Sequence, residues 1–303
     1  MNKNKLWPVV ALLFGASLWG IIWYPYRLLQ KGGVEGVPAT LFSYLVAVLL
    51  ASLLFARAWR EFAKAPVVLI LLGLASGSCN LAYVLGILHG EVMRVLLLFY
   101  LAPLWTVPLA RAILDERIGR AGYAVIALAL AGAVVMLWKP ALGVPVPATT
   151  AEWLGLGSGF SFALANVLVR RAEGCSVAAK SLSVLGGVAL VSLISLFLLG
   201  TGAALNVGAI AAAWPLILGI GAVLVVMGLM VQYGLSHTPA TQAIVIMLFE
   251  LIVAAVASYL LAGEIMALQE WVGGAMIIVA SLFSGHVEAQ PALAKPVPAA
   301  AEL

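Results

Sequence analysis

The 303-residue chain is 64% hydrophobic and only 9% charged, and its formal net charge is +4. Soluble proteins carry about a quarter charged residues, so the composition excludes a soluble globular domain and predicts an all-α integral membrane protein. The basic balance is what orientation in a membrane requires, and it indicates no nucleic-acid partner.

Long apolar runs, separated by short clusters of charge, Gly and Pro, predict ten transmembrane helices. A helix needs about 20 apolar residues to cross the hydrocarbon. Because the first run continues past Trp23 without a small-residue cleavage site, it is interpreted as a helix and not as a signal peptide. The expected spans are 6–29, 37–57, 66–88, 92–113, 119–138, 152–171, 177–199, 212–235, 239–262 and 267–285.

The basic residues predict that both termini are cytoplasmic. Basic residues concentrate on the cytoplasmic side of membrane proteins. With ten spans, the inner side collects Lys3, Lys5, Arg57, Arg60, Lys64, Arg111, Arg117, Arg120, Arg170, Arg171, Lys180 and Lys295. The outer side keeps Arg27, Lys31, Arg94 and Lys139. An odd number of spans would spoil this separation.

An internal repeat relates the two halves of the chain. The stretch 97–117 returns in degenerate form at 245–265, in a register that sets Pro103 against Leu251, Glu116 against Glu264 and Ala102 against Glu250. Each half holds five spans, an odd number, so we expect inverted repeats. The predicted division is 1–138, a Pro-rich linker at 139–151, 152–285, and a disordered tail at 286–303.

Inverted repeats with a site near the bilayer midplane are a plan of secondary transporters, and polar or aromatic residues inside the spans are therefore candidate substrate ligands. Glu250 is the sharpest of these, because an acid at the bilayer centre costs about 2.5 to 3.5 kcal/mol on insertion scales. The other candidates are Trp19, Tyr24, Asn80, Tyr83, Tyr100, Trp105, Asn166, Gln232, Tyr233, Gln242 and Phe249. Each also has a structural interpretation as packing, as interfacial anchoring, or as a hydrogen bond between helices.

Further residues have expected roles in shape or gating. Pro103 removes one backbone hydrogen bond and predicts a kink. His89 and His237 pair in the repeat and are either gate residues or ordinary interfacial histidines. Glycines spaced four apart, at 73 and 77 and at 155 and 159, predict close helix packing.

Several classes of chemistry lack support in the sequence. It contains no phosphate-binding loop, dinucleotide fingerprint, Ser/His/Asp arrangement or zinc spacing, so we expect no cofactor, no metal and no enzymatic activity. Cys79 and Cys175 form no disulfide framework. The span centres carry no basic residue, which argues against a phosphorylated substrate.

The segments APLWTVPLARAILDER and ELIVAAVASYLLAGE, each followed by a Gly- and Ala-rich helix, resemble the EamA branch of the drug/metabolite transporter superfamily. Together with SLWG and WYPY in the first span, they are similar to bacterial inner-membrane exporters of aromatic and other neutral amino acids. One departure is Leu251, where second repeats of this family usually carry proline, so a kink is less expected in span 239–262 than in 92–113.

The resemblance implies a small-molecule exporter in a lipid bilayer, able to act as a monomer, that works by alternating access. It implies a central cavity where Trp19, Tyr83 and Tyr100 stack on an apolar side chain. In that arrangement Asn80, Asn166, Gln232, Gln242 and Glu250 meet the polar end of an amino acid. The alternatives left open are efflux of drugs or aromatic cations, a passive channel, and a membrane-embedded enzyme or lipid-handling protein.

Overall fold

The computed structural model describes residues 3–34, 36–90, 92–116, 118–138, 147–198, 205–262 and 267–283, and these residues form a bundle of helices. The first half contains α1 (Lys3–Lys31), α2 (Gly36–Leu54), the 3-10 helix η1 (Ala56–Ala63), α3 (Pro66–His89), α4 (Val92–Phe99), α5 (Ala102–Leu114) and α6 (Arg120–Leu137). The second half contains α7 (Thr150–Arg171), α8 (Val177–Leu198), α9 (Val207–Ala212), α10 (Trp214–His237), α11 (Ala240–Met247), α12 (Phe249–Ala257), the π-helix η4 (Ser258–Ala262) and α13 (Leu268–Leu282).

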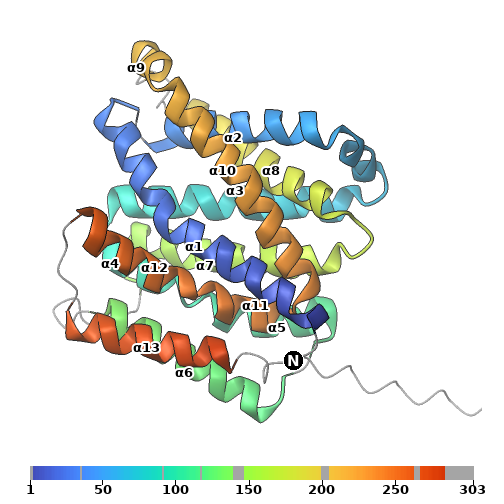
Figure 1. The fold of residues 1–303 in the computed structure, drawn as a ribbon, viewed down its shortest axis with the longest axis vertical. Helices are drawn as coiled ribbons and strands as arrows, with labels where there is room; N and C mark the ends of the chain where they lie inside the picture. Colours follow the sequence, from blue (N-terminus) through green and yellow to red (C-terminus); the bar gives the residue numbers. More distant parts are fainter. Residues whose placement is uncertain are drawn as a thin grey trace, which may run out of the picture.

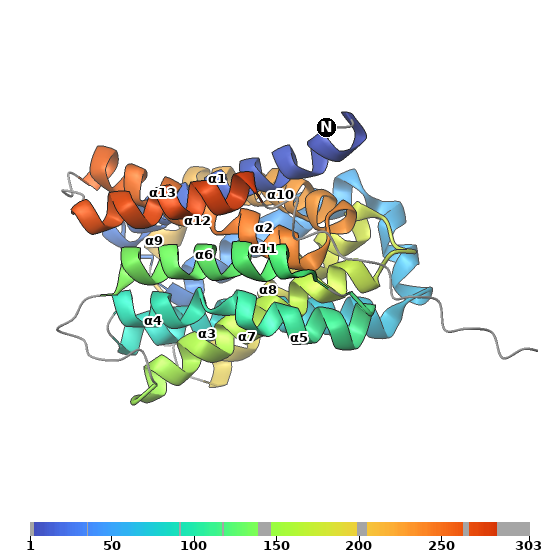
Figure 2. The same ribbon diagram turned by 90° about the horizontal axis from the view of Figure 1, so that it is seen from below.

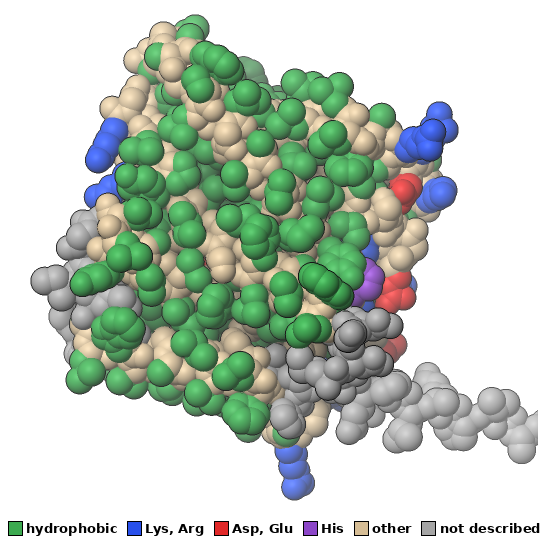
Figure 3. Space-filling view, in the orientation of Figure 1, with side chains coloured by type: hydrophobic (Ala, Val, Ile, Leu, Met, Phe, Trp, Pro, Cys, Tyr) green, Lys and Arg blue, Asp and Glu red, His purple; other side chains and the backbone are tan. Residues whose placement is uncertain are grey.

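The bundle has the surface of a membrane protein. Its helices lie side by side, with their connections at two opposite edges (Figure 1). Seen from below, α1, α12 and α13 lie on one side of the bundle and α3, α5 and α7 on the other (Figure 2). Apolar side chains cover the middle of the face shown in Figure 3, whereas the charged ones gather at its edges. A belt of this kind suits hydrocarbon, in which the backbone polar groups are satisfied inside each helix.

Nine segments of the described chain are long and apolar enough to cross a membrane. The tenth predicted span corresponds to α13, whose apolar part, Trp271–Leu282, is shorter than the other nine. The helix nevertheless packs along α6, where the backbones of Gly132 and Gly273 meet. The number of ten spans therefore stays a prediction.

The two halves are interleaved and do not form separate bodies. Helix α1 packs against α10, α11 and α12, while α3 packs against α7 and α8. Helix α2 lies against α8 and α10, and α4 and α5 lie against α7. The pairing is reciprocal, because α3 lies on α7 and α8 as α10 lies on α1 and α2. Most helices of the first half thus find their main neighbours in the second.

Corresponding helices of the two halves end in one register. Helix α3 runs from Pro66 to His89 and α10 from Trp214 to His237, so both ends differ by 148 residues. The same difference relates α4 (Val92–Phe99) to α11 (Ala240–Met247). This is the register that sets Pro103 against Leu251 in the sequence. The inversion of one half relative to the other remains a proposal, developed below.

Some predicted boundaries were wrong. Span 37–57 ends at Leu54, and span 212–235 begins only at Trp214, after the separate short helix α9. The predicted linker 139–151 runs into α7, which begins at Thr150 because Thr149 accepts a hydrogen bond from the Glu152 backbone N–H at 3.3 Å. This Thr-x-x-Glu pattern is a helix-start signal. Residues 139–146 of the linker and the predicted tail 286–303 lie outside the described residues.

Candidate functional site

Two membrane spans are interrupted at equivalent positions. The span that contains Pro103 breaks at Tyr100 and Leu101, and Pro103 lies in the first turn of α5. The span that contains Glu250 breaks at Leu248, between α11 and α12, although Leu251 stands where Pro103 stands in the first half. At both breaks a backbone N–H bonds three residues back, from Leu104 to Leu101 and from Leu251 to Leu248. The break in span 239–262 is the milder one, as the absence of proline led us to expect, because Leu248 keeps helical dihedrals and its N–H still bonds the Ile244 backbone oxygen.

Close helix packing accompanies each break. A Cβ on Gly20 of α1 would lie 2.8 Å from the backbone oxygen of Glu250. A Cβ on Gly159 of α7 would lie 2.5 Å from the backbone oxygen of Phe99. Each glycine therefore lets a neighbouring helix press directly on the irregular backbone. Packing of this kind supports a break with or without a proline.

Glu250 lies in the first turn of α12, near the middle of the span Ala240–Leu261. The positive end of a helix dipole favours a carboxylate at this position. Its side chain is hydrogen-bonded to the hydroxyl of Tyr100, which stands at the break in the other half. The contact joins the two interrupted spans at the same depth of the bundle.

Four aromatic rings pack into one cluster beside this contact. The ring of Phe99 lies 5.3 Å from Tyr83, 4.9 Å from Tyr100 and 5.4 Å from Phe162, measured between centroids. These rings come from α3, α4, the break and α7. Aromatic pairs at such distances contribute about 0.5 to 1.5 kcal/mol beyond the apolar area that they bury. The cluster thus offers flat apolar surfaces next to a carboxyl group.

Cys79 and Ser158 complete the wall of this region. The Ser158 hydroxyl donates to the backbone oxygen of Cys79 at 2.9 Å, and the Cys79 sulfur lies 3.7 Å from the same hydroxyl. Sequence reasoning missed Phe99, Phe162, Cys79 and Ser158. Nothing distinguishes them from ordinary packing residues in an apolar run, except that Phe99 adjoins Tyr100.

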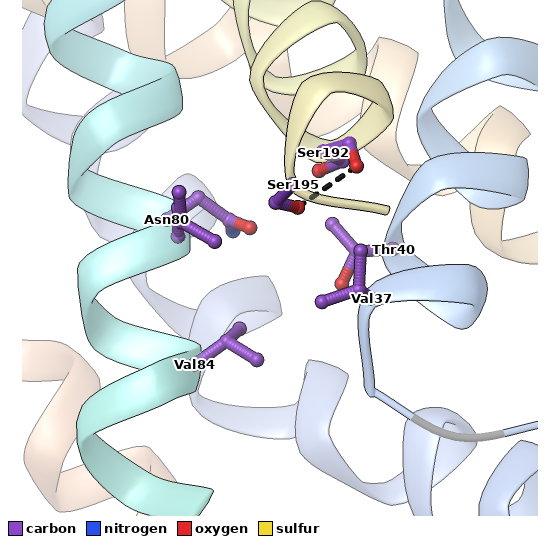
Figure 4. A pocket seen from close by; sticks show the side chains of 7 residues that line it. Val37, Thr40, Asn80, Val84, Ser192 and Ser195 are labelled. Carbon is purple, nitrogen blue, oxygen red and sulfur yellow. Dashed lines mark hydrogen bonds between the residues drawn. The ribbon is translucent and has the colours of Figure 1, made fainter. Parts of the chain in front are cut away.

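Asn80 lies in a different place from Tyr83. It lines a shallow crevice, too small to hold a water molecule, with Val37, Thr40, Leu81, Val84, Ser192 and Ser195 (Figure 4). The crevice lies between α2, α3 and α8, where the Ser195 hydroxyl donates to the backbone oxygen of Ser192 at 2.8 Å. The single central cavity that would join Asn80 to Tyr83 is not seen among the described side chains.

The remaining predicted ligands are scattered. Trp105 packs edge-on against Phe160 at 5.6 Å, away from the aromatic cluster. Asn166 and Gln232 are buried, and each has one side-chain polar atom without a hydrogen-bond partner in the described structure. Trp19 and Phe249 are half-buried against the larger apolar core, Tyr24 lies 5.7 Å from Trp23, and Gln242 is half-buried on α11.

The two paired histidines make the same local contact. His89 Nδ1 lies 2.9 Å from the Leu85 backbone oxygen, and His237 Nδ1 lies 2.8 Å from that of Tyr233. Both bonds run back one turn within the same helix, and both histidines end equivalent helices. No grouping of His, Cys, Asp and Glu able to hold a metal occurs among the described residues.

The apolar belt and the long apolar helices define a multi-pass membrane protein. Two of its spans are irregular near the carboxyl group of Glu250. The EamA-like transporter family matches the chain twice, over residues 6–138 and 149–285, and the chain belongs to this family. It is 27% identical to an uncharacterized transporter of Archaeoglobus fulgidus over 204 residues, which cover 67% of this chain and 70% of that protein.

The fold also resembles a solved structure, described only as the crystal structure of a protein. The TM-score is 0.72 at 14% sequence identity, over 91% of this chain and 95% of the other. At this identity the likeness concerns the fold alone. Membrane transport is therefore the activity that the comparisons support.

Proposed function

We propose that the protein is a secondary transporter that exports aromatic and other neutral amino acids, or similar small metabolites, from the bacterial cytoplasm. The observation that carries the proposal is the contact between Tyr100 and Glu250 beside the cluster of aromatic rings. Aromatic faces suit an apolar or aromatic side chain, and a carboxylate suits an ammonium group. Both chemistries lie at the breaks of the two spans.

The energetic cost of Glu250 supports a functional role. An ionised acid in the membrane centre is expensive unless it is paired, neutralised or exposed to water. Within the described residues no Lys or Arg lies against Glu250, and its hydrogen-bond partner is the neutral hydroxyl of Tyr100. A substrate ammonium would supply the missing positive charge. The aromatic rings around it would hold the apolar part of the same molecule.

Alternating access is the mechanism that we propose for the movement. The equal helix ends at a displacement of 148 residues, and the reciprocal packing of α3 and α10, support two inverted repeats. Such repeats exchange roles when the site opens to the other side. The breaks at Tyr100 and Leu248 then lie where the two halves move against each other.

The distribution of basic residues supports the orientation. Arg57, Arg60, Arg120 and Arg171 are exposed near helix ends that lie at one edge of the bundle, whereas Arg27 and Lys31 lie at the opposite end of α1. Basic residues favour the cytoplasmic side, so we assign the edge that carries Arg57, Arg60, Arg120 and Arg171 to the cytoplasm. We call this edge the basic face. Both termini would then be cytoplasmic in the inner membrane.

Substrate efflux from loaded proteoliposomes tests the proposal. Replacing Tyr83→Ala or Glu250→Gln should lower the efflux of radiolabelled aromatic amino acids at least about tenfold, the effect of losing more than 1.4 kcal/mol of substrate binding. The control is Tyr123→Ala, since Tyr123 lies on α6 with 53% of its surface exposed. Unchanged efflux in both site variants would refute the assignment.

Efflux of drugs or aromatic cations is the second candidate, favoured by the unpaired carboxyl of Glu250. A cation without a carboxylate would need Glu250 and the rings alone. Competition separates the two functions: an amino acid and its amide-capped or decarboxylated analogue are compared as inhibitors of efflux. Stronger inhibition by the decarboxylated cation would favour this second function.

A further inference from the structure

A polar network at the basic face joins the ends of helices from both halves. Glu116 follows α5, and one of its carboxylate oxygens accepts a hydrogen bond from the Ala240 backbone N–H at 3.2 Å. The other oxygen lies 3.7 Å from Nε of Arg170, on α7. Arg170 in turn donates to the backbone oxygen of Ser236 at 2.7 Å, and Lys180 donates to the Ser236 hydroxyl at 2.8 Å.

Two members of this network are buried, whereas Arg170 is 24% exposed and Ser236 is half-buried. The side chain of Glu116 is 8% exposed and Lys180, on α8, is 2% exposed. Ionised side chains are rarely this buried unless they are paired. The backbone helps to place Glu116, because Asp115 before it has a φ of 56°, a left-handed conformation that a residue other than glycine adopts at a cost. This turn ends α5 and directs the chain toward α11.

An apolar plug lies beside the network. Ala110, Val167 and Ala240, from α5, α7 and α11, are all fully buried and pack with Leu109, Ile113 and Leu114. Helices α5 and α11 are the segments of the two broken spans that reach the basic face, and they pack against each other. Their partners toward the opposite face differ, because α4 packs against α3, α6 and α7. Parting of α5 and α11 would open a path from the basic face toward Tyr100 and Glu250.

We propose that Glu116, Arg170, Ser236 and Lys180 form a latch that holds the basic face of the transporter closed. The inference rests on the proposed function as a carrier with a site at the two breaks. It adds a conformational role for residues outside the contact between Tyr100 and Glu250. The carboxylate of Glu116 sits on the N-terminus of α11, where the helix dipole favours a negative charge. Opening this face separates Glu116 from Ala240 and from Arg170.

The charges of Glu116 and Arg170 determine how each substitution changes the closed state. Removing Arg170 leaves the Glu116 carboxylate buried without its cation, and breaking one partner of a buried ion pair is strongly destabilising. The closed state of Arg170→Gln should therefore open, because opening returns Glu116 to water. Replacing Glu116 by Gln in addition removes the buried charge while keeping an oxygen for the Ala240 N–H, so the double variant should be more closed than Arg170→Gln.

Thiol labelling from each side of the membrane tests the latch. The reporter is Thr241→Cys in a Cys79→Ala, Cys175→Ser background. Thr241 is 1% exposed, and it lies one turn from Ile244 and Val245, which pack in the same core cluster as Tyr100. A membrane-impermeant maleimide is applied to inside-out and to right-side-out vesicles. Arg170→Gln should raise the labelling rate from the basic face about tenfold.

The controls make the outcome decisive. Arg171→Gln, at the exposed neighbour of Arg170, should label like the parent, and Glu116→Gln/Arg170→Gln should label more slowly than Arg170→Gln. Lys180→Met, which removes the bond to Ser236 with little change of shape, should also raise labelling and serves if Arg170→Gln fails to fold. Parent-like labelling in folded Arg170→Gln and Lys180→Met would overturn the latch. Since labelling requires no substrate, this failure is distinguishable from a failure of transport.

Discussion

Two carboxyl groups in this protein meet opposite environments. Glu250 lies at mid-membrane with a tyrosine hydroxyl as its partner, whereas Glu116 lies at the basic face with Arg170 and a helix N-terminus. The first has no Lys or Arg beside it in the described part of the chain and is therefore suited to bind a cation. The second is already satisfied by the chain itself and is suited to hold helices together. Position relative to cations, and not residue type, separates the two roles.

Acidification should tighten the latch. Burial raises the pKa of Glu116, and the negative charge of Glu173 adds to this effect. Arg170 and the Ala240 N–H lower the same pKa but do not cancel the rise. Lys180 lies beyond Arg170. In the closed state Glu116 binds a proton more firmly than it does when it is exposed in the open state. Lowering the pH from above this raised pKa toward the ordinary value of 4.5 therefore favours closure. The stabilisation is lost again as the pH rises through the raised pKa.

Labelling of Thr241→Cys from the basic face measures this effect. Its rate, divided by the rate of the same reporter with Glu116→Gln, cancels the titration of the thiol itself. The ratio should fall as the solution on the basic face is acidified. A ratio independent of pH would show that Glu116 does not titrate in the transition between closed and open states.

At the scale of the helix, small residues decide which pairs approach closely. Helices α3 and α8 cross with the backbones of Gly73 and Gly187 in direct contact, and Gly77 meets the same segment of α8. The glycine spacing predicted close packing of α3, and the structure confirms it. The partner helix could not be predicted, because Gly186 and Gly187 are adjacent in sequence and only one of them faces α3.

Substitution of these two adjacent glycines should have opposite effects. In Gly187→Ala the new Cβ would meet the backbone oxygen of Gly73, and overpacking of this kind costs about 1 to 3 kcal/mol. In Gly186→Ala nothing lies within 4 Å of the new Cβ, and alanine favours a helix by up to about 1 kcal/mol over glycine. Gel filtration of heated detergent samples should show a lower midpoint for Gly187→Ala only; equal midpoints would contradict the crossing.

The sequence predicted helix positions well and side-chain neighbourhoods poorly. Helix α3 was expected at 66–88 and runs from Pro66 to His89, since hydrophobic length alone sets a span. Asn80 and Tyr83 were expected to face one cavity, yet a rotation of less than one turn sends Asn80 to α2 and α8 and Tyr83 to Phe99. Uniformly apolar helices carry no signal for that rotation.

In the whole molecule, the two halves of the sequence do not form two separate units, because their helices are interleaved. Helices α1, α2 and α3 each pack mainly on helices of the second half, so neither half has a complete set of neighbours by itself. The double match to one family nevertheless divides the chain between residues 138 and 149. We therefore expect the packing between the halves not to depend on the covalent link between residues 138 and 149.

Expression of the chain as two polypeptides, cut between Val146 and Pro147, tests this expectation. The halves should copurify and should restore efflux when they are produced together, because the contacts between them do not depend on the link. Each half alone should elute as an aggregate, since its unpaired surfaces include the glycine seams. A first half that is monodisperse by itself would contradict the packing described here.

The same interleaving imposes a schedule on synthesis. Helix α3 ends at His89, but its partners α7 and α8 are complete only at Leu198, and translation adds about 5 to 20 residues per second. For a period of about 5 to 20 seconds, α3 therefore lies in the membrane before the α8 surface that Gly73 and Asn80 face has been made. The surface of α3 is therefore exposed first to lipid and later to the packed helices α7 and α8.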